Sequence, residues 1–321
     1  MDRITLALFI GFIWDLIWGD PRWLPHPVVL MGKIITKLET ALRAIFPKTA
    51  AGEKAAGGFL ALLLPLGAFG VSYGLLWLLG RVSPWLRVAG EAFMCYQVLA
   101  TKDLKQESIA VYRCLRNGDL AAARLAVGRI VGRDVNALDE TGVTKAAVET
   151  VAENTADGVI APMLYLALGG APLGFAYKAV NTMDSMVAYH NEKYEHFGFF
   201  PARLDDAANF LPARIAGLCM VVSAFFTGLS GKNAAKIFAR DRYNHASPNS
   251  AQTEAVMAGA LEVQLAGDAV YFGRVVHKKT IGDAIRPVEA EDIRRANRLM
   301  MATSVFCLSL CILVRIGMEL L

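Results

Sequence analysis

Four long apolar stretches constrain this chain more than any other feature of its sequence. A helix needs about 20 apolar residues to cross the roughly 30 Å hydrocarbon layer of a bilayer. Stretches of this kind occupy residues 57–80, 158–179, 210–229 and 298–320. They predict an integral membrane protein.

Two further apolar stretches, at residues 4–19 and 85–100, are shorter and contain charged side chains. Asp15 lies in the first, and Arg87 and Glu91 lie in the second. The sequence therefore predicts about four to six membrane helices. The first stretch runs on past Asp15 without a small-residue cleavage site, so we do not expect a removable signal peptide.

The composition excludes several classes of protein. Hydrophobic residues make up 55% of the chain and charged residues only 19%, which rules out a disordered chain and argues against a water-soluble globule. The five cysteines form no CxxC pair, so neither a disulfide framework nor a zinc site is indicated. The net charge is +4 and the basic residues are spread along the chain, so no nucleic-acid partner is expected.

The polar segments between the apolar stretches are rich in lysine and arginine, and the positive-inside rule places such loops in the cytoplasm. Two of them are long, at about residues 101–157 and 231–297. Apolar spacing near 3.6 residues predicts helices at 108–115 and 120–131. Because we find no strand-like alternation and no internal repeat, we predict an all-α protein with helical polar loops and a single membrane domain over residues 1–321.

The stretch at residues 158–179 contains a helix-breaking sequence. Gly169-Gly170-Ala171-Pro172 combines two flexible residues with a proline that lacks a backbone N–H. We expect the helix to break there, in the middle of its span. Such a break is tolerated at membrane depth where protein buries it.

A first polar cluster lies where the N-terminal apolar stretch ends. Asp15, Asp20 and His26 bring two carboxylates and one imidazole there. A membrane-edge cap with tryptophan anchors is the alternative interpretation. Asp15 favours a functional site, because a charged side chain inside an apolar run is costly and usually functional.

A second cluster forms one face of a predicted helix. Lys145, Glu149 and Glu153 follow one another at i, i+4 spacing, so they share that face. Asp157 continues toward the next apolar stretch. A salt-bridged, solvated face fits the spacing equally well, but carboxylate oxygens of this kind also suit Mg²⁺.

A third cluster borders two apolar stretches with a high density of amide, acidic and basic groups. Its candidate residues are Lys178, Asn181, Asp184, Ser185, Arg203, Asp205, Asp206 and Arg214. The adjacent carboxylates could instead serve as favourable charges at a helix N-terminus. The density of polar groups favours a site in which the lysine and the arginines neutralise phosphate oxygens.

A fourth cluster surrounds the turn Ser247-Pro248-Asn249, which precedes an alanine-rich helix, and it continues to Glu254 in that helix. A capped helix start is the simpler interpretation, with Ser247 or Asn249 as the cap. His245 beside the turn is a candidate polar contact. The chain contains neither GxGxxG nor GxxxxGK[ST], so a dinucleotide fold or a P-loop is not indicated.

Several motifs follow one another in order between Asp15 and Asp283. They include Gly19-Asp20-Pro21, Pro25-His26-Pro27-Val28, Val131-Gly132-Arg133-Asp134, Val148-Glu149-Thr150-Val151-Ala152-Glu153-Asn154, Tyr177-Lys178-Ala179, Asn181-Thr182 with Asp184-Ser185-Met186, Ala202-Arg203-Leu204-Asp205-Asp206, and Ser247-Pro248-Asn249. In this series the chain resembles the CobD/CbiB family, the adenosylcobinamide-phosphate synthases. Val135, Ala188 and His190 depart from the family's common residues, and none of them removes a charged motif residue.

The resemblance implies an integral enzyme of the bacterial inner membrane that acts in cobalamin biosynthesis. Such an enzyme would join the ring D propionate of adenosylcobyric acid to aminopropanol or aminopropanol phosphate. The implied partners are this corrinoid, the amine, membrane lipid and neighbouring late corrinoid enzymes.

Amide formation from a carboxylate and an amine is uphill in water, so we expect ATP to activate the acid as an acyl phosphate. This route needs Mg²⁺ and cations for the phosphate oxygens, and a base to free the amine. Candidate catalytic residues are Glu149, Glu153, Asp184, Asp205, Asp206 and His26, with His26 or Glu153 as the base. Candidate Mg²⁺ ligands are Asp15, Asp20, Asp157, Asp184 and Asp205. Candidate substrate- or phosphate-binding residues are Lys178, Asn181, Ser185, Arg203, Arg214, His245 and Asn249.

Two other classes of function compete with the enzyme hypothesis. A transporter or channel would explain Asp15 and the predicted break at residues 169–172, because intramembrane charge and broken helices often line a path. The long polar loops and the lack of an inverted repeat argue against it. A membrane scaffold for the late corrinoid enzymes is the third class.

Overall fold

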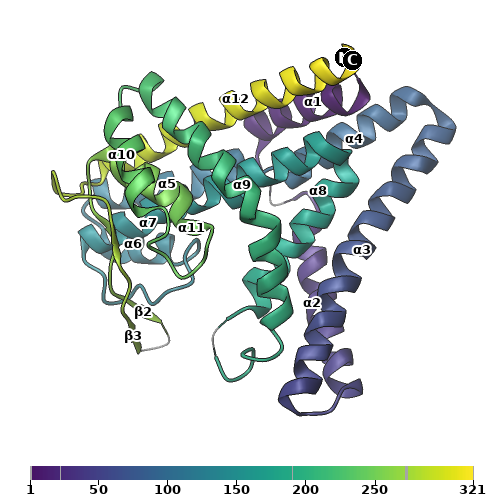
Figure 1. The fold of residues 1–321 in the computed structure, drawn as a ribbon, viewed down its shortest axis with the longest axis horizontal. Coiled ribbons are helices and arrows are strands. Elements are labelled where there is room, and N and C mark those ends of the chain that lie inside the picture. The colour runs from purple at the N-terminus through teal and green to yellow at the C-terminus, as the bar shows by residue number, and fades with distance from the viewer. Residues whose placement is uncertain (1, 22, 190, 272–273, 321) are drawn as a thin grey trace. The chain divides into compact units, whose positions relative to one another are not determined.

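The computed structural model describes residues 2–21, 23–189, 191–271 and 274–320, so His190 lies outside the described residues. Its regular structure is almost entirely helical (Figure 1). The predicted all-α class is confirmed. The chain divides into two compact units, which are described separately.

Unit 1 comprises Met1–Ala100, Pro162–Asn209 and Cys311–Leu321. Its helices are α1 (Arg3–Trp18), α2 (Pro27–Ile45), α3 (Ala50–Val82), α4 (Pro84–Val98) and nearly all of α8 (Ala161–Val187). α1 packs on α4, and α3 packs on both α2 and α4. The two long helices α2 and α3 run side by side in Figure 1.

The core of unit 1 joins α2, α3 and the second half of α8. Ile35, Leu60 and Met183 are fully buried in it, together with Phe197 from the segment after α8. Full burial of a side chain of this size stabilises a fold by about 1.5–3 kcal/mol. The polar residues at the end of α8 therefore stand on a rigid support.

The predicted break in α8 is confirmed. Gly169 and Gly170 have non-helical backbone angles, and Gly170 has φ +68° and ψ −165°, a conformation that is almost restricted to glycine. Arg315 donates a hydrogen bond of 2.8 Å from its Nη1 to the carbonyl oxygen of Ala167. A carbonyl next to the break thus has a side-chain partner, as a broken membrane helix requires.

Unit 2 comprises Thr101–Ala161 and Phe210–Leu310. Its helical elements are α5 (Thr101–Arg116), α6 (Leu120–Val127), α7 (Glu140–Asn154), the π-helical turn η1 (Thr155–Ile160), α10 (Gly231–Asp241) and α11 (Ser250–Leu261). The first polar loop is therefore helical, as predicted. α7 packs on α5, α6 and α11.

Helix α11 is buried along its whole length. It consists mostly of small residues, which allow neighbouring backbone to approach closely. A Cβ atom at Gly259 would lie 2.7 Å from the carbonyl oxygen of Asn233 in α10. Any polar side chain on α11 therefore faces protein on all sides.

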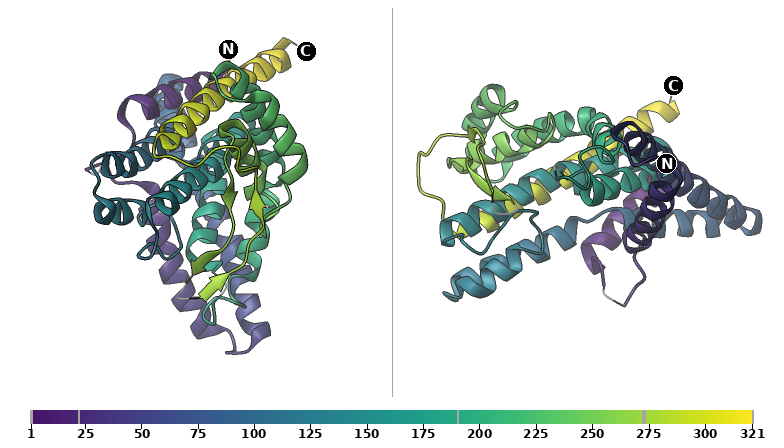
Figure 2. Two further views of the ribbon diagram at one scale, coloured as in Figure 1. Left: turned by 90° about the vertical axis from the view of Figure 1, so that its left-hand side faces the viewer. Right: turned by 90° about the horizontal axis from the view of Figure 1, so that it is seen from below.

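Four short strands follow α11 and were not predicted. β1 (Leu265–Ala266) pairs with β4 (Thr280–Ile281), and β2 (Ala269–Tyr271) pairs with β3 (Arg274–Val276), both antiparallel. They form the narrow ribbon of arrows in the left view of Figure 2. Pairs of two or three residues are too short to leave a period-two pattern in a sequence.

Four helical stretches among the described residues are long and apolar enough to cross a membrane. They are α3, the continuous run Glu140–Val187, α9 (Phe199–Phe226) and α12 (Glu291–Leu320). These four contain or overlap the four long apolar stretches of the sequence. The two doubtful stretches form α1 and α4, whose 16 and 15 residues are shorter than a typical span.

Substitution Gly170→Ala is expected to destabilise unit 1. The new methyl group would lie 2.3 Å from Oε1 of Glu91, and the backbone conformation alone costs a non-glycine residue about 1–3 kcal/mol. Thermal unfolding of the purified protein in detergent measures the effect. Gly74→Ala is the control, because nothing lies within 4 Å of its Cβ position, and equal unfolding temperatures for both variants would contradict the prediction.

Candidate functional site

Two glutamates on one face of α7 are held by partners in unit 2. Arg133 donates from Nη2 to Oε2 of Glu149 at 2.5 Å, and the backbone N–H of Ala266 donates to Oε1 of the same residue at 2.8 Å. One turn further along, Ser250 donates from Oγ to Oε1 of Glu153 at 2.8 Å. Both glutamates of the predicted shared face are therefore half-buried and contact other elements of unit 2.

A third carboxylate, Glu254, lies on the fully buried helix α11. Burial raises the pKa of this carboxyl group well above 4.5, and the negative charges of Glu153 and Glu149 raise it further. The positive charges of Lys278 and Arg133 oppose this shift without cancelling it. The shift favours the protonated form of Glu254.

The sequence alone assigned no role to Glu254. It also did not predict that Arg133 lies near this residue. An acidic residue inside an alanine-rich apolar helix was the available signal for Glu254. Burial of α11 on every side is a tertiary property, and it is what makes this carboxyl group unusual.

His245 is a neutral imidazole in this cluster. Burial lowers its pKa, and the positive charge of Lys278 lowers it too, while the charge of Glu153 acts in the opposite direction. Its Nδ1 accepts a 3.0 Å hydrogen bond from the backbone N–H of Ser247. The proton of the neutral ring must therefore sit on Nε2, so His245 donates and does not act as a base.

Asn249 and Arg214 meet at the start of α11. Arg214 Nη1 is 3.5 Å from Oδ1 of Asn249, and its guanidinium lies 3.5 Å from the ring centroid of Phe210. Asn249 occupies the N-cap position without a side-chain capping hydrogen bond, and Ser247 Oγ instead accepts from its backbone N–H.

Asp157, the remaining candidate of unit 2, lies half-buried in the π-helical turn η1.

In unit 1, a chain of hydrogen bonds connects α8 to the first turns of α9. Tyr177 donates from its hydroxyl to Oδ1 of Asn209 at 2.7 Å, and Asn209 donates from Nδ2 to Oδ2 of Asp205 at 3.0 Å. Tyr165 stacks on Tyr177 with ring centroids 4.8 Å apart. Asp205 is thereby held in one orientation.

The other candidates of this cluster are more exposed. Ser185 is exposed and donates to the backbone oxygen of Asn181, while Lys178 and Asp184 are half-buried on α8. Arg203 is 70% exposed and lies 3.9 Å from Asp206. An exposed pair of this length contributes little to stability.

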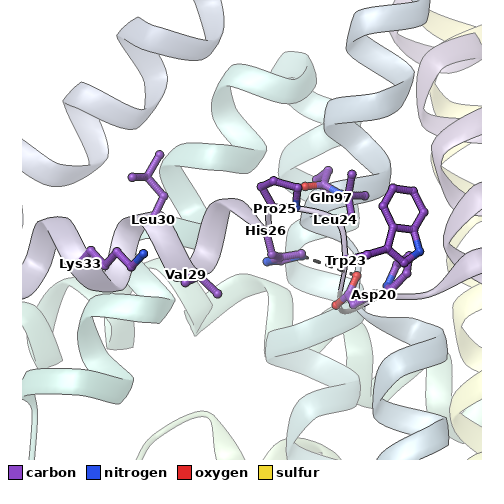
Figure 3. Close-up of a pocket in the computed structure, with 10 residues that line it drawn as sticks. Asp20, Trp23, Leu24, Pro25, His26, Val29, Leu30, Lys33 and Gln97 are labelled. Carbon is purple, nitrogen blue, oxygen red and sulfur yellow. Dashed lines mark ion pairs between the residues drawn. The ribbon is translucent and has the colours of Figure 1, made fainter.

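Also in unit 1, the candidates of the first cluster lie around the connection between α1 and α2. Asp15 is fully buried in α1. His26 caps α2 by accepting from the backbone N–H of Val28 at its Nδ1, 3.3 Å away. Its Nε2 lies 3.5 Å from Oδ1 of Asp20, and Figure 3 shows these two side chains pointing toward one another.

The Asp20–His26 pair borders a pocket of about 630 Å³ in unit 1. Trp23, Leu30, Lys33 and Gln97 also line it (Figure 3). Because Nδ1 of His26 accepts from the backbone, its Nε2 carries the proton when the ring is neutral. This nitrogen and Oδ1 of Asp20 are close to one another but make no hydrogen bond among the described residues.

The described residues contain no group of three or more histidine, cysteine, aspartate or glutamate side chains arranged to hold a metal ion. The assignments of Asp15, Asp20, Asp157, Asp184 and Asp205 as Mg²⁺ ligands stay predictions.

Comparison with known proteins gives one consistent result. The family model described as CobD/Cbib protein matches residues 8–300. The cobalamin biosynthesis protein CobD of Geobacter metallireducens is 50% identical over 301 residues, which cover 94% of this chain and 93% of that protein. CobD of Clostridium perfringens is 42% identical and covers 98% and 99%, and CbiB of Salmonella typhimurium is 46% identical and covers 98% of each chain. No solved structure matches the chain.

Glu254→Gln is expected to change how stability depends on pH. The raised pKa means that the folded protein binds this proton more tightly than the unfolded chain, so the wild-type stability falls as pH rises from 4.5 through the folded-state pKa. The glutamine variant cannot ionise and lacks this fall.

Thermal unfolding in detergent between pH 4 and pH 9 measures the difference. The stability of the variant relative to the wild type should rise with pH over this window. Glu195→Gln, at an exposed position, is the control. A difference that stays constant with pH would show that Glu254 is ionised in the folded protein.

Proposed function

Since the chain belongs to the CobD/CbiB protein family, we propose that it forms the amide bond between the ring D propionate of adenosylcobyric acid and aminopropanol or aminopropanol phosphate. The family match covers most of the chain, and the relatives carry the name cobalamin biosynthesis protein. The observation that carries the reaction is the cluster of Glu149, Glu153 and Glu254 with its adjacent cations in unit 2.

The proposed reaction has two steps. An oxygen of the propionate attacks the γ-phosphorus of ATP, the bond to the β-phosphate oxygen breaks, and ADP leaves. The amine nitrogen then attacks the carbonyl carbon of the acyl phosphate, and inorganic phosphate leaves. The nitrogen must lose its extra proton to a base on the protein.

Glu153 is the favoured base among the candidates. The imidazoles of His26 and His245 each use Nδ1 to accept from a backbone N–H, so neither has a second lone pair to take a proton. Both oxygens of Glu149 already accept hydrogen bonds. Glu153 accepts from Ser250 at one oxygen, which orients the carboxylate without neutralising it.

The remaining polar groups are proposed to bind the anionic parts of the substrates. Arg133 and Lys278 act on the carboxylates of unit 2 through their positive charges, so they supply the cations that phosphate oxygens require. Lys178, Arg203 and Arg214 are further candidates for the same role, and Asn181, Ser185 and Asn249 can donate hydrogen bonds.

Magnesium fits this protein only with help from the substrate. Since no described group of three ligating side chains exists, Mg²⁺ would be held by one or two carboxylates and by nucleotide phosphates, which is its usual mode of binding. When bound, it would neutralise phosphate charge.

We also propose that the protein is a multi-pass protein of the bacterial inner membrane, with its basic loops in the cytoplasm and other late corrinoid enzymes as neighbours. The positive-inside rule supports this orientation. Four apolar helices indicate a membrane protein.

A transporter is the second candidate function, favoured by buried Asp15 and by the broken helix α8. The packing around the break argues against a solute path, since Gly170 lies against Glu91 and the Ala167 carbonyl is bonded to Arg315. The enzyme hypothesis therefore accounts for more of the structure.

The purified protein in detergent is expected to release one ADP for each amide formed when it is given the corrinoid acid, aminopropanol phosphate, ATP and Mg²⁺. Chromatography of the corrinoids and a coupled ADP assay measure the two products. Reactions without ATP or without the amine are the controls. Amide formation without any nucleotide would exclude the acyl-phosphate route.

Glu153→Gln is expected to lower the turnover rate by about 10²- to 10⁴-fold, the usual contribution of a general base. The amide side chain preserves the shape and the contact with Ser250, so the unfolding temperature should change little. Glu195→Gln, an exposed control, should keep full activity. Wild-type turnover in Glu153→Gln would remove this residue from catalysis.

A further inference from the structure

We propose that the pocket beside the Asp20–His26 pair binds a large amphiphile with amide groups at its edge, and that Gln97 donates a hydrogen bond to one of its carbonyl oxygens. Identification of this ligand as the corrinoid rests on the proposed function. None of the residues Trp23, Lys33 and Gln97 was a candidate from the sequence.

Gln97 carries the argument. It lies near the end of α4 with only 3% of its surface exposed, and it lines the pocket. Its Nε2 is buried and has no hydrogen-bond partner among the described residues. A buried amide donor without a partner is costly, so its position at a pocket wall indicates a ligand that accepts a hydrogen bond.

The size of the pocket selects a large ligand. Its volume of about 630 Å³ corresponds to roughly 20 water molecules at about 30 Å³ each, and it lies within the range usual for small-molecule sites. A three-carbon amino alcohol would fill only a small part of it. A macrocycle with side chains is the better match.

The lining of the pocket is apolar along its walls and polar at two places. Leu24, Val29 and Leu30 provide apolar surface, and Trp23 adds an indole that is 81% exposed. Asp20 and His26 lie at one end, and Lys33 lies seven residues further along α2, about 10 Å away at the helical rise. A ligand that contacts both ends must therefore be broad, apolar in its middle and polar at its edge.

A corrinoid acid has this chemistry, because a largely apolar ring carries carboxamide side chains and a free carboxylate. The carbonyl of one carboxamide can accept from Gln97, and the carbonyl of another can accept from the ammonium of Lys33. A phospholipid offers only its ester carbonyls to Gln97, whereas a corrinoid offers a ring of carboxamides, and the experiment distinguishes the two ligands.

Binding of dicyanocobyric acid to the full-length protein in detergent tests the inference. Equilibrium dialysis without ATP or amine, followed by corrin absorbance, measures Kd independently of turnover. Gln97→Ala should raise Kd about 2- to 10-fold, as expected for one hydrogen bond. Val29→Trp, at a position that is 58% exposed and so tolerates a larger side chain, should fill the pocket and raise Kd by more than about 10-fold.

Trp85→Ala is the matched control for Trp23→Ala. Trp85 is 76% exposed in the same unit and does not line this pocket. Only Trp23→Ala should weaken binding, and unfolding temperatures of all variants verify that they fold.

The outcomes separate this inference from the proposed function. Wild-type binding that survives Gln97→Ala and Val29→Trp unchanged overturns the pocket assignment, and so does the absence of wild-type binding. Displacement of copurified phospholipid by Val29→Trp without loss of corrinoid binding also overturns it, in favour of a lipid site. Binding that follows the predicted pattern in a protein that forms no amide upholds the pocket and rejects the ligase function.

Discussion

A carboxylate that is taken out of water needs a cation or a hydrogen-bond donor, and both units of this protein are organised around that requirement. Glu91, with only 3% of its side chain exposed, is paired with Arg3 at 3.2 Å, which ties α4 to α1. Asp292, fully buried, receives hydrogen bonds from Arg286 and Arg295. Removing one partner from such a pair typically costs 3–5 kcal/mol, roughly the effect of losing a large core side chain.

The glutamates of unit 2 are subject to the same constraint, and they carry the proposed chemistry. Like charges held close together disfavour one another's ionised forms. Burial and the charges of the two half-buried carboxylates raise the pKa of Glu254, which favours its protonated form. Glu149 is neutralised by Arg133, and among the described residues Glu153 accepts its hydrogen bond from the neutral hydroxyl group of Ser250. In the proposed reaction, Glu149 is thus a charge partner and Glu153 is the base.

Local patterns in the sequence predicted the features that depend on neighbouring residues alone. The apolar runs predicted the four membrane helices, Gly169-Gly170-Ala171-Pro172 predicted the break in α8, and i, i+4 spacing placed Glu149 and Glu153 on one face. The contacts that give these residues a role join distant segments. Ser250 reaches Glu153 across 97 positions of the chain, and no spacing rule links such residues. For this reason Gln97 was missed, and Glu254 was named in a cluster but given no role.

The sequence by itself determined that this is an all-α membrane protein of the CobD/CbiB family. The length and hydrophobicity of a helix depend only on residues that are adjacent in the chain, and the family motifs are short enough to be read directly. Only the tertiary structure decided which carboxylates are paired, which imidazole nitrogens carry protons and which amide faces a pocket. Burial and partnership arise when separate helices pack, and a glutamate that would be solvated on an isolated helix has its pKa raised by burial inside α11.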